Sequence, residues 1–252
     1  MNNWILTDDF IRQNNARILV NSKIQPRYVN QPQSEKHDNS NTEDSVSDLL
    51  KECLWAIKKL QFKKPLTEIQ KSTGLPAGTF SRIIQKLGRK KFVKVIQLPF
   101  GRGRPKYPVL LPDGYKELGI QEKKYNGKGA GYEHTLYQYL IVEYFSDFNP
   151  EIELNRNEKF IDVGIERNEK LIAIEVAMTP VHEKENIEKD ITLAKADYVI
   201  VACINKKVQE KVKEIVSQMP ENFQNKSEVC LLSEFLKRKP EELLINQTKL
   251  NL

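Results

Sequence analysis

Two acidic residues interrupt neighbouring apolar stretches in the second half of the chain. Asp162 stands inside residues 160–165, Phe-Ile-Asp-Val-Gly-Ile, and Glu175 inside residues 171–177, Leu-Ile-Ala-Ile-Glu-Val-Ala. A buried carboxylate is costly unless a partner or a cation compensates it. Two converging carboxylates would bind Mg²⁺ or Mn²⁺, which position and activate water for phosphodiester hydrolysis. The alternative is that both acids face solvent or belong to a salt bridge.

A second informative group is basic and lies in the first half. Residues 101–106, Gly-Arg-Gly-Arg-Pro-Lys, place Arg102 and Arg104 between glycines, and Pro105 stiffens the segment. Arginines presented on an extended segment suit a narrow minor groove, where the negative potential of DNA is strongest. This segment is therefore expected to contact duplex DNA.

The helix expected before this segment has two different faces. Phe80, Ile83, Ile84 and Leu87 recur at helical spacing and point inward together. The opposite face is small, polar or cationic, as a helix in the major groove requires; the alternative is an ordinary solvated face. We predict DNA contacts from nine residues of the helix and the basic segment: Thr79, Ser81, Arg82, Gln85, Lys86, Arg89, Arg102, Arg104 and Lys106.

Elements around these residues follow a familiar order. The pattern predicts helices from Val46 to Leu60, over 67–73 and over the two-faced segment, then strands at 92–98 and 107–111 and a helix from Asp113. Residues 75–114 resemble winged-helix repressors of the multiple-antibiotic-resistance type, and the basic segment also resembles an AT-hook. The resemblance implies a winged helix-turn-helix over residues 47–122 that binds DNA. A winged helix used for protein contacts is the alternative.

The second half alternates helices and strands. A long helix begins at Tyr132, a hairpin carries Asp162 and Glu175, and helix, strand and helix follow to residue 219. This arrangement resembles the PD-(D/E)XK restriction-endonuclease-like superfamily. The resemblance implies a mixed-sheet α/β/α domain over 131–219, with catalytic Glu133, Asp162 and Glu175 and a metal held by the last two.

One position departs from the superfamily pattern. Where its lysine should follow the second acid, this chain has Ala177. That lysine acts on the attacking water and stabilises developing negative charge. We predict Lys189 as its replacement, with Lys184 second, although either lysine could lie on a solvated helix face. His134 could assist at the site or merely pack.

Composition limits the remaining choices. The 252 residues carry a net charge of +6, but residues 1–130 hold 24 Lys and Arg against 12 Asp and Glu, and residues 131–252 hold 16 against 22. A basic half suits a polyanion such as nucleic acid. We expect a fold of class α+β and α/β, an arm or helix at 1–20, a flexible linker at 21–46, a domain boundary at 123–131 and a C-terminal extension at 220–252.

Cysteine and apolar patterns exclude other classes. Three dispersed cysteines and three histidines form no zinc-ligand spacing, and no apolar run reaches the length of a membrane span. The start of the chain lacks a secretory signal pattern. We therefore expect a cytoplasmic homodimer that binds double-stranded DNA, with Mg²⁺ or Mn²⁺ as cofactor. Its second half is either a DNA endonuclease or, given Ala177, a degenerate nuclease-like domain in a transcriptional or mobile-element regulator.

Overall fold

The computed structural model describes residues 40–122 and 131–239. The expected N-terminal arm, most of the expected linker and the expected boundary segment lie outside these residues. Helix α2 spans Ser40–Leu60, so residues 40–46 are helical rather than linker. The first turn of a helix fixes three residues for one hydrogen bond, but each residue added afterwards gains one hydrogen bond of its own. A helix that has formed can therefore continue past its apolar stripe.

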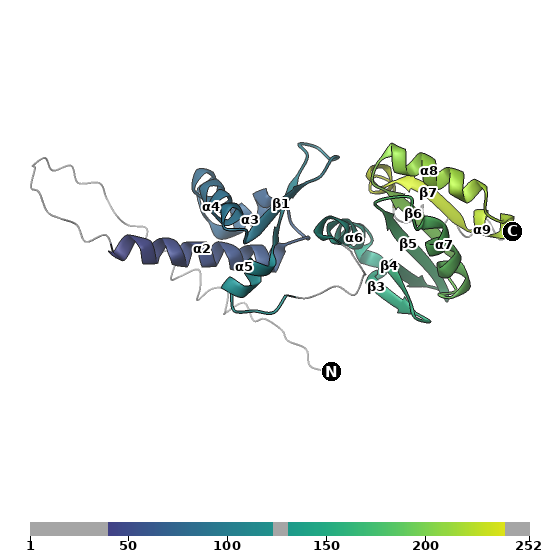
Figure 1. Cartoon of the computed structure of the whole chain (residues 1–252), viewed down its shortest axis with the longest axis horizontal. Helices are drawn as coiled ribbons and strands as arrows, with labels where there is room; N and C mark the ends of the chain where they lie inside the picture. The colour runs from purple at the N-terminus through teal and green to yellow at the C-terminus, as the bar shows by residue number, and fades with distance from the viewer. Residues whose placement is uncertain (1–39, 123–130, 240–252) are drawn as a thin grey trace, which may run out of the picture. The chain divides into compact units, whose positions relative to one another are not determined.

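The first described part consists of helices followed by a two-stranded sheet and one further helix. Its elements after α2 are α3 (Leu66–Thr73), α4 (Ala77–Arg89), β1 (Val93–Gln97), β2 (Lys106–Leu110) and α5 (Pro112–Glu117). Strands β1 and β2 are antiparallel. In Figure 1 the loop between them extends beyond the ends of both strands.

Local sequence explains where these helices end and which face they bury. Gly74 adopts a left-handed backbone with φ of 67° and donates its N–H to the carbonyl of Lys71, which closes α3. The four apolar residues predicted to point inward from α4, Phe80, Ile83, Ile84 and Leu87, are all buried. They pack in one core with residues of α2, α3, β1, β2 and α5.

The second described part is built on a five-stranded mixed sheet in the order β3-β4-β5-β6-β7. Strands β3 (Glu151–Arg156), β4 (Lys159–Arg167) and β5 (Lys170–Ala177) are antiparallel neighbours. Strands β6 (Tyr198–Cys203) and β7 (Ser227–Leu231) continue the sheet parallel to β5. The chain is therefore a mixed α and β protein.

Helices cover both faces of this sheet. Helix α6 (Tyr132–Tyr144) and the short α10 (Leu232–Phe235) pack against one face, and α7 (Glu183–Thr192), α8 (Lys206–Ser217) and α9 (Glu221–Gln224) against the other. A short 3₁₀ turn, η1 (Ser146–Phe148), follows α6. Figure 1 shows α6 and α7 on opposite sides of β4 and β5. Residues on β4 and β5 are thus within reach of both helical layers.

Two strands were missed by the sequence pattern. Strand β3 lies at one edge of the sheet, and β7 lies at the other edge within the expected C-terminal extension. The sheet domain therefore continues past its expected end at residue 219, because 227–231 pair with β6. No helix in the described ranges has the length and apolar character needed to cross a membrane.

Gly164 allows β3 and β4 to pack closely. A Cβ atom added there would lie 2.2 Å from Cδ2 of Leu154 on the neighbouring strand. Such a contact would force Leu154 or the backbone to move, so a larger residue at 164 would disturb the packing of these two strands. This close approach fixes the strand that carries Asp162.

Candidate functional site

The backbone is irregular at Asp162. Its neighbours Ile161 and Val163 pack in opposite core layers, although regular alternation would put both on one face of the sheet. On β3 the facing residue, Glu153, has a φ of 52°, and the pairing passes from Ile152↔Val163 to Leu154↔Ile161 without it. A local distortion of this kind re-aims a side chain.

Strands β4 and β5 separate at the two predicted acids. Their pairing ends at Val163↔Ile174, and the next residue on each strand is Asp162 or Glu175. The Asp162 carboxylate occupies the gap, where its Oδ2 accepts a 2.8 Å hydrogen bond from the backbone N–H of Val176. The two acids thus lie on adjacent arms of one hairpin, as the sequence predicted.

Helix α6 contributes two polar side chains to Asp162. His134 Nε2 lies 3.0 Å from Asp162 Oδ2, and Gln138 Nε2 donates to Oδ1 at 3.1 Å. The two residues are four apart, which places them on the same face of the helix. Both carboxylate oxygens of Asp162 therefore have hydrogen-bond partners.

Lys159 is the cation at the second acid. Its Nζ donates to Glu175 Oε1 at 3.1 Å and lies 3.1 Å from Asp190 Oδ1 on α7. A third contact, to the carbonyl oxygen of Phe160, measures 2.9 Å. Lys159 therefore links an acid of β5 to an acid of α7.

Helix α7 presents one buried face to the sheet. Glu183, Ile187 and Asp190 are its buried residues, at positions i, i+4 and i+7. Ile187 packs in the core. Asp190 contacts Lys159, and Glu183 is a buried acid on which Asp162 exerts the largest charge effect. The acidic cluster is therefore Asp162, Glu175, Glu183 and Asp190.

Burial and mutual repulsion raise the pKa of three of these acids. Burial, together with the charges of Asp162 and Asp190, raises the pKa of Glu175 well above its usual value. Burial and the Asp162 charge raise the pKa of Glu183 to about 7. Burial also raises the pKa of Asp190 to about 6, although Lys159 opposes that shift. The cluster therefore has more negative charge than its partners offset, which favours a proton or a cation.

The two basic groups respond in the opposite sense. Burial disfavours the charged form of Lys159, but Glu175 and Asp190 together outweigh it and raise the pKa of the lysine. Burial likewise disfavours charged His134, and Asp162 outweighs it, so that the histidine pKa is also raised. Both groups are stabilised as cations by the acids they contact.

The structure does not bring all predicted catalytic residues together. Glu133 is exposed on α6, and the next residue, His134, contacts Asp162 in its place. The Lys189 prediction is corrected: this side chain is half exposed and ion-paired to Glu185 on the same helix. Lys189 directly precedes Asp190, so it lies about 100° around the helix from that edge of the buried face.

Lys184, the second lysine considered, is also exposed and pairs with Glu188. Lys159 was missed because it is the first residue of a strand after a tight turn, a position where lysines are commonly solvated. His134 and Gln138 carried a detectable signal, since their spacing of four gives a polar pair on a largely apolar helix.

The cluster contains oxygens of the kind that a hard cation binds, but they do not form a complete set. Among residues 40–122 and 131–239, no three His, Cys, Asp or Glu side chains are arranged to hold a metal ion. Glu175 contacts Lys159, whereas Oε2 of Glu183 and Oε1 of Gln138 are buried without a hydrogen-bond partner in this part of the chain. Carboxylate and amide oxygens are ligands that Mg²⁺ and Mn²⁺ accept.

The basic residues of the first half have the opposite environment. Apart from half-buried Thr79, the predicted contact residues of α4 are exposed: Ser81, Arg82, Gln85, Lys86 and Arg89. In the loop and at the start of β2, Arg102, Arg104 and Lys106 are exposed as well. Gly101 and Gly103 have φ values of 87° and 74°, a left-handed backbone that glycine adopts readily. These side chains are free to meet a large ligand.

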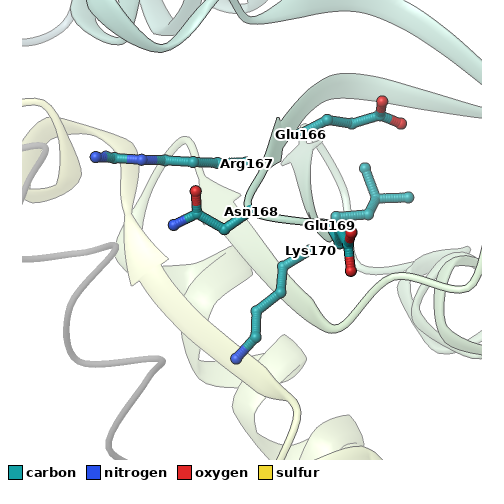
Figure 2. Close-up of a pocket in the computed structure, with 6 residues that line it drawn as sticks. Glu166, Arg167, Asn168, Glu169 and Lys170 are labelled. Carbon is teal, nitrogen blue, oxygen red and sulfur yellow. The ribbon is translucent and has the colours of Figure 1, made fainter.

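A surface hollow lies elsewhere, at the turn that joins β4 and β5. It is lined by residues 166–171. Figure 2 shows its charged side chains pointing in different directions rather than toward one centre. Glu166 is ion-paired to Arg156, and Arg167 lies 5.0 Å from the ring centre of Phe148. This hollow is separate from the acidic cluster and shows no convergent chemistry.

Comparison of the chain with protein-family models, with curated proteins and with solved structures gives no match.

Proposed function

We propose that the protein is a metal-dependent DNA endonuclease in which a winged helix-turn-helix binds the duplex and the sheet domain hydrolyses a phosphodiester. The observation that carries the catalytic part is the contact of Lys159 with Glu175, the second predicted acid, and with Asp190. The superfamily pattern requires a lysine next to its acids, and Ala177 had left that requirement unmet. Lys159 would meet it from another position.

The DNA-binding part of the proposal rests on exposed cations. Helix α4 would enter the major groove with Arg82 and Gln85 at base edges, and the β1–β2 loop would direct Arg102 and Arg104 into the minor groove. Cations at both places neutralise phosphates and make binding dependent on salt. Double-stranded DNA is accordingly the proposed partner.

In the proposed reaction each side chain has a separate task. The Lys159 ammonium would orient the attacking water and stabilise the negative charge that develops on the phosphate. Glu175 and Asp190 hold the ammonium group in place. His134 and Gln138 fix the orientation of the Asp162 carboxylate.

The metal part of the proposal rests on charge, because the acids of the cluster exceed its bases and a cation would offset the excess. Mg²⁺ or Mn²⁺ would be held by Asp162 and by a buried acid beside it; Glu175 is the acid that the sequence assigns. When bound, the ion would polarise the phosphodiester and lower the pKa of a water molecule.

Incubating the full chain with supercoiled and linear DNA tests the proposal. We expect nicked or linear product with Mn²⁺ or Mg²⁺ and none with EDTA. Asp162→Asn should abolish cleavage and leave DNA binding intact, whereas Glu185→Gln, an exposed acid on α7, should cut as the parent does. DNA binding without cleavage under any of these conditions would contradict the catalytic part.

That outcome would favour a second candidate, a DNA-binding regulator with a degenerate nuclease-like domain. One observation supports it: in the described residues the carboxylates are not arranged as a complete metal site. In that case the sheet domain would serve for DNA contact or dimerisation.

A further inference from the structure

Glu183 and Asp190 are the acids of the cluster with carboxylate oxygens buried without a hydrogen-bond partner in the described residues, and of the two only Asp190 forms an ion pair there, with Lys159. Glu183 is the first residue of α7, and only 6% of its surface is exposed. Its Oε2 is buried and has no hydrogen-bond partner within the described part of the chain. Buried polar atoms are nearly always satisfied, so such an atom calls for a further partner, which can be a water, an ion or a ligand.

Gln138 has the same feature on the opposite side of Asp162. This residue is 1% exposed and donates from Nε2 to Asp162 Oδ1, while its Oε1 is buried without a partner in the described residues. Two unsatisfied oxygens thus come from the two helical layers that enclose one carboxylate.

The charges that act on Glu183 include this same carboxylate. Asp162 is the strongest charge acting on Glu183, followed by Lys159, Asp190 and His134. Glu183 also directly follows the loop that leaves the carboxyl end of β5, where Asp162 bonds to Val176. Ligands of mixed sheets commonly bind at the carboxyl ends of parallel strands.

Glu175 is differently placed. Its Oε1 contacts Lys159 at 3.1 Å, and Lys159 in turn contacts Asp190. A cation bound by Glu175 would have to displace that ammonium group or share the carboxylate with it. Glu183 has no such cation within hydrogen-bond distance of its Oε2.

We propose that Glu183, and not Glu175, is the second carboxylate ligand of the divalent cation, which it binds together with Asp162 and the amide oxygen of Gln138. This assignment rests on the proposed function for the presence of a metal. It makes α7 part of the metal site and leaves Glu175 to hold Lys159.

Thermal unfolding of the full chain with increasing Mn²⁺ tests the assignment without any measurement of activity. A bound cation raises the melting temperature by mass action, and the dependence on concentration gives an apparent Kd. We expect Asp162→Asn to abolish the rise and Glu183→Gln to weaken Mn²⁺ binding by about tenfold or more. Glu175→Gln should weaken it less, and the exposed control Glu185→Gln should not change it.

Stability without metal separates a ligand from a structural residue. In EDTA, Glu183→Gln should unfold at a temperature no lower than the parent protein, because the change removes a buried charge next to Asp162. A lower melting temperature in EDTA with an unchanged response to Mn²⁺ would overturn the assignment. So would a larger loss of Mn²⁺ affinity in Glu175→Gln than in Glu183→Gln, which would leave the proposed function in place. No response to Mn²⁺ in the parent protein would overturn both.

Discussion

The two described halves differ in the environment of the charged side chains to which a function is proposed. Cations of α4 and the β1–β2 loop are exposed, as Arg82, Arg102 and Arg104 are. In the sheet domain Glu175, Glu183 and Asp190 are buried, and their pKa values are raised. Exposed cations can bind a polyanion with little desolvation cost, whereas buried acids are poised to bind a proton or a metal ion.

This contrast assigns DNA affinity to the exposed cations and metal binding to the buried acids. A substitution among the exposed cations should change DNA binding and leave the sheet domain intact. A substitution among the buried acids should change metal binding and pH dependence and leave DNA affinity almost unaltered. Variants of either group can therefore test whether DNA binding and metal binding are separate.

The largest expected effect on binding comes from the loop between β1 and β2. Arg102→Ala combined with Arg104→Ala should weaken duplex DNA binding by about a hundredfold at low salt and lower the salt slope by about 2. Electrophoretic shifts or fluorescence anisotropy at several salt concentrations measure both quantities. The matched control is Lys170→Ala, an exposed lysine of the sheet domain. Equal losses in the control and the double variant would contradict the division.

The pH dependence of stability comes next in size. Glu183 has a folded pKa of about 7, above its ordinary value, so the folded state retains a proton that the unfolded state releases. The stability contributed by protonated Glu183 is present at low pH and is lost as pH rises toward and through 7.

Urea unfolding in EDTA at pH 5 and pH 8 measures this effect. Relative to Glu183→Gln, the parent protein should lose on the order of 2 kcal/mol between these pH values. The control Glu185→Gln should track the parent. A difference between parent and Glu183→Gln that does not vary with pH would show that this carboxyl titrates normally.

The smallest effect is expected at α4. Arg82→Ala should reduce discrimination at one or two base pairs by about tenfold each, because a base-edge contact contributes about 1–3 kcal/mol. Binding profiles over a randomised duplex library measure this change. If Arg82→Ala lowers affinity equally for all sequences, its contact is with phosphate and not with bases.

Sequence patterns predicted the parts of this molecule that depend on local spacing. The buried stripe of α4 follows from helical periodicity, and the hairpin with Asp162 and Glu175 follows from two apolar runs around a polar turn. Such features arise from residues a few positions apart, so the sequence contains the needed information.

Local spacing could not predict contacts between elements that lie far apart in the sequence. Lys159 meets Asp190 of another element, 31 positions later, and no spacing rule relates the two residues. Lys189 was predicted in its place because it lies in the helix after the second acid. Helix geometry turns that side chain away from the sheet, toward Glu185. Strand β7 was missed for the same reason. Its one strand neighbour in the described sheet is β6, and helices α8 and α9 separate the two strands in the sequence.

Cleavage by two lysine variants tests the central claim most directly. Supercoiled DNA is incubated in Mn²⁺ with excess full-length protein, as the parent, Lys159→Met or Lys189→Met, and DNA binding is measured in parallel. We expect the parent to cut, Lys159→Met to cut at least about 100-fold more slowly with unchanged DNA affinity, and Lys189→Met to cut at the parent rate. Equal rates for Lys159→Met and the parent, or a parent that binds DNA and does not cut it, would contradict the claim that Lys159 replaces the lysine missing at Ala177.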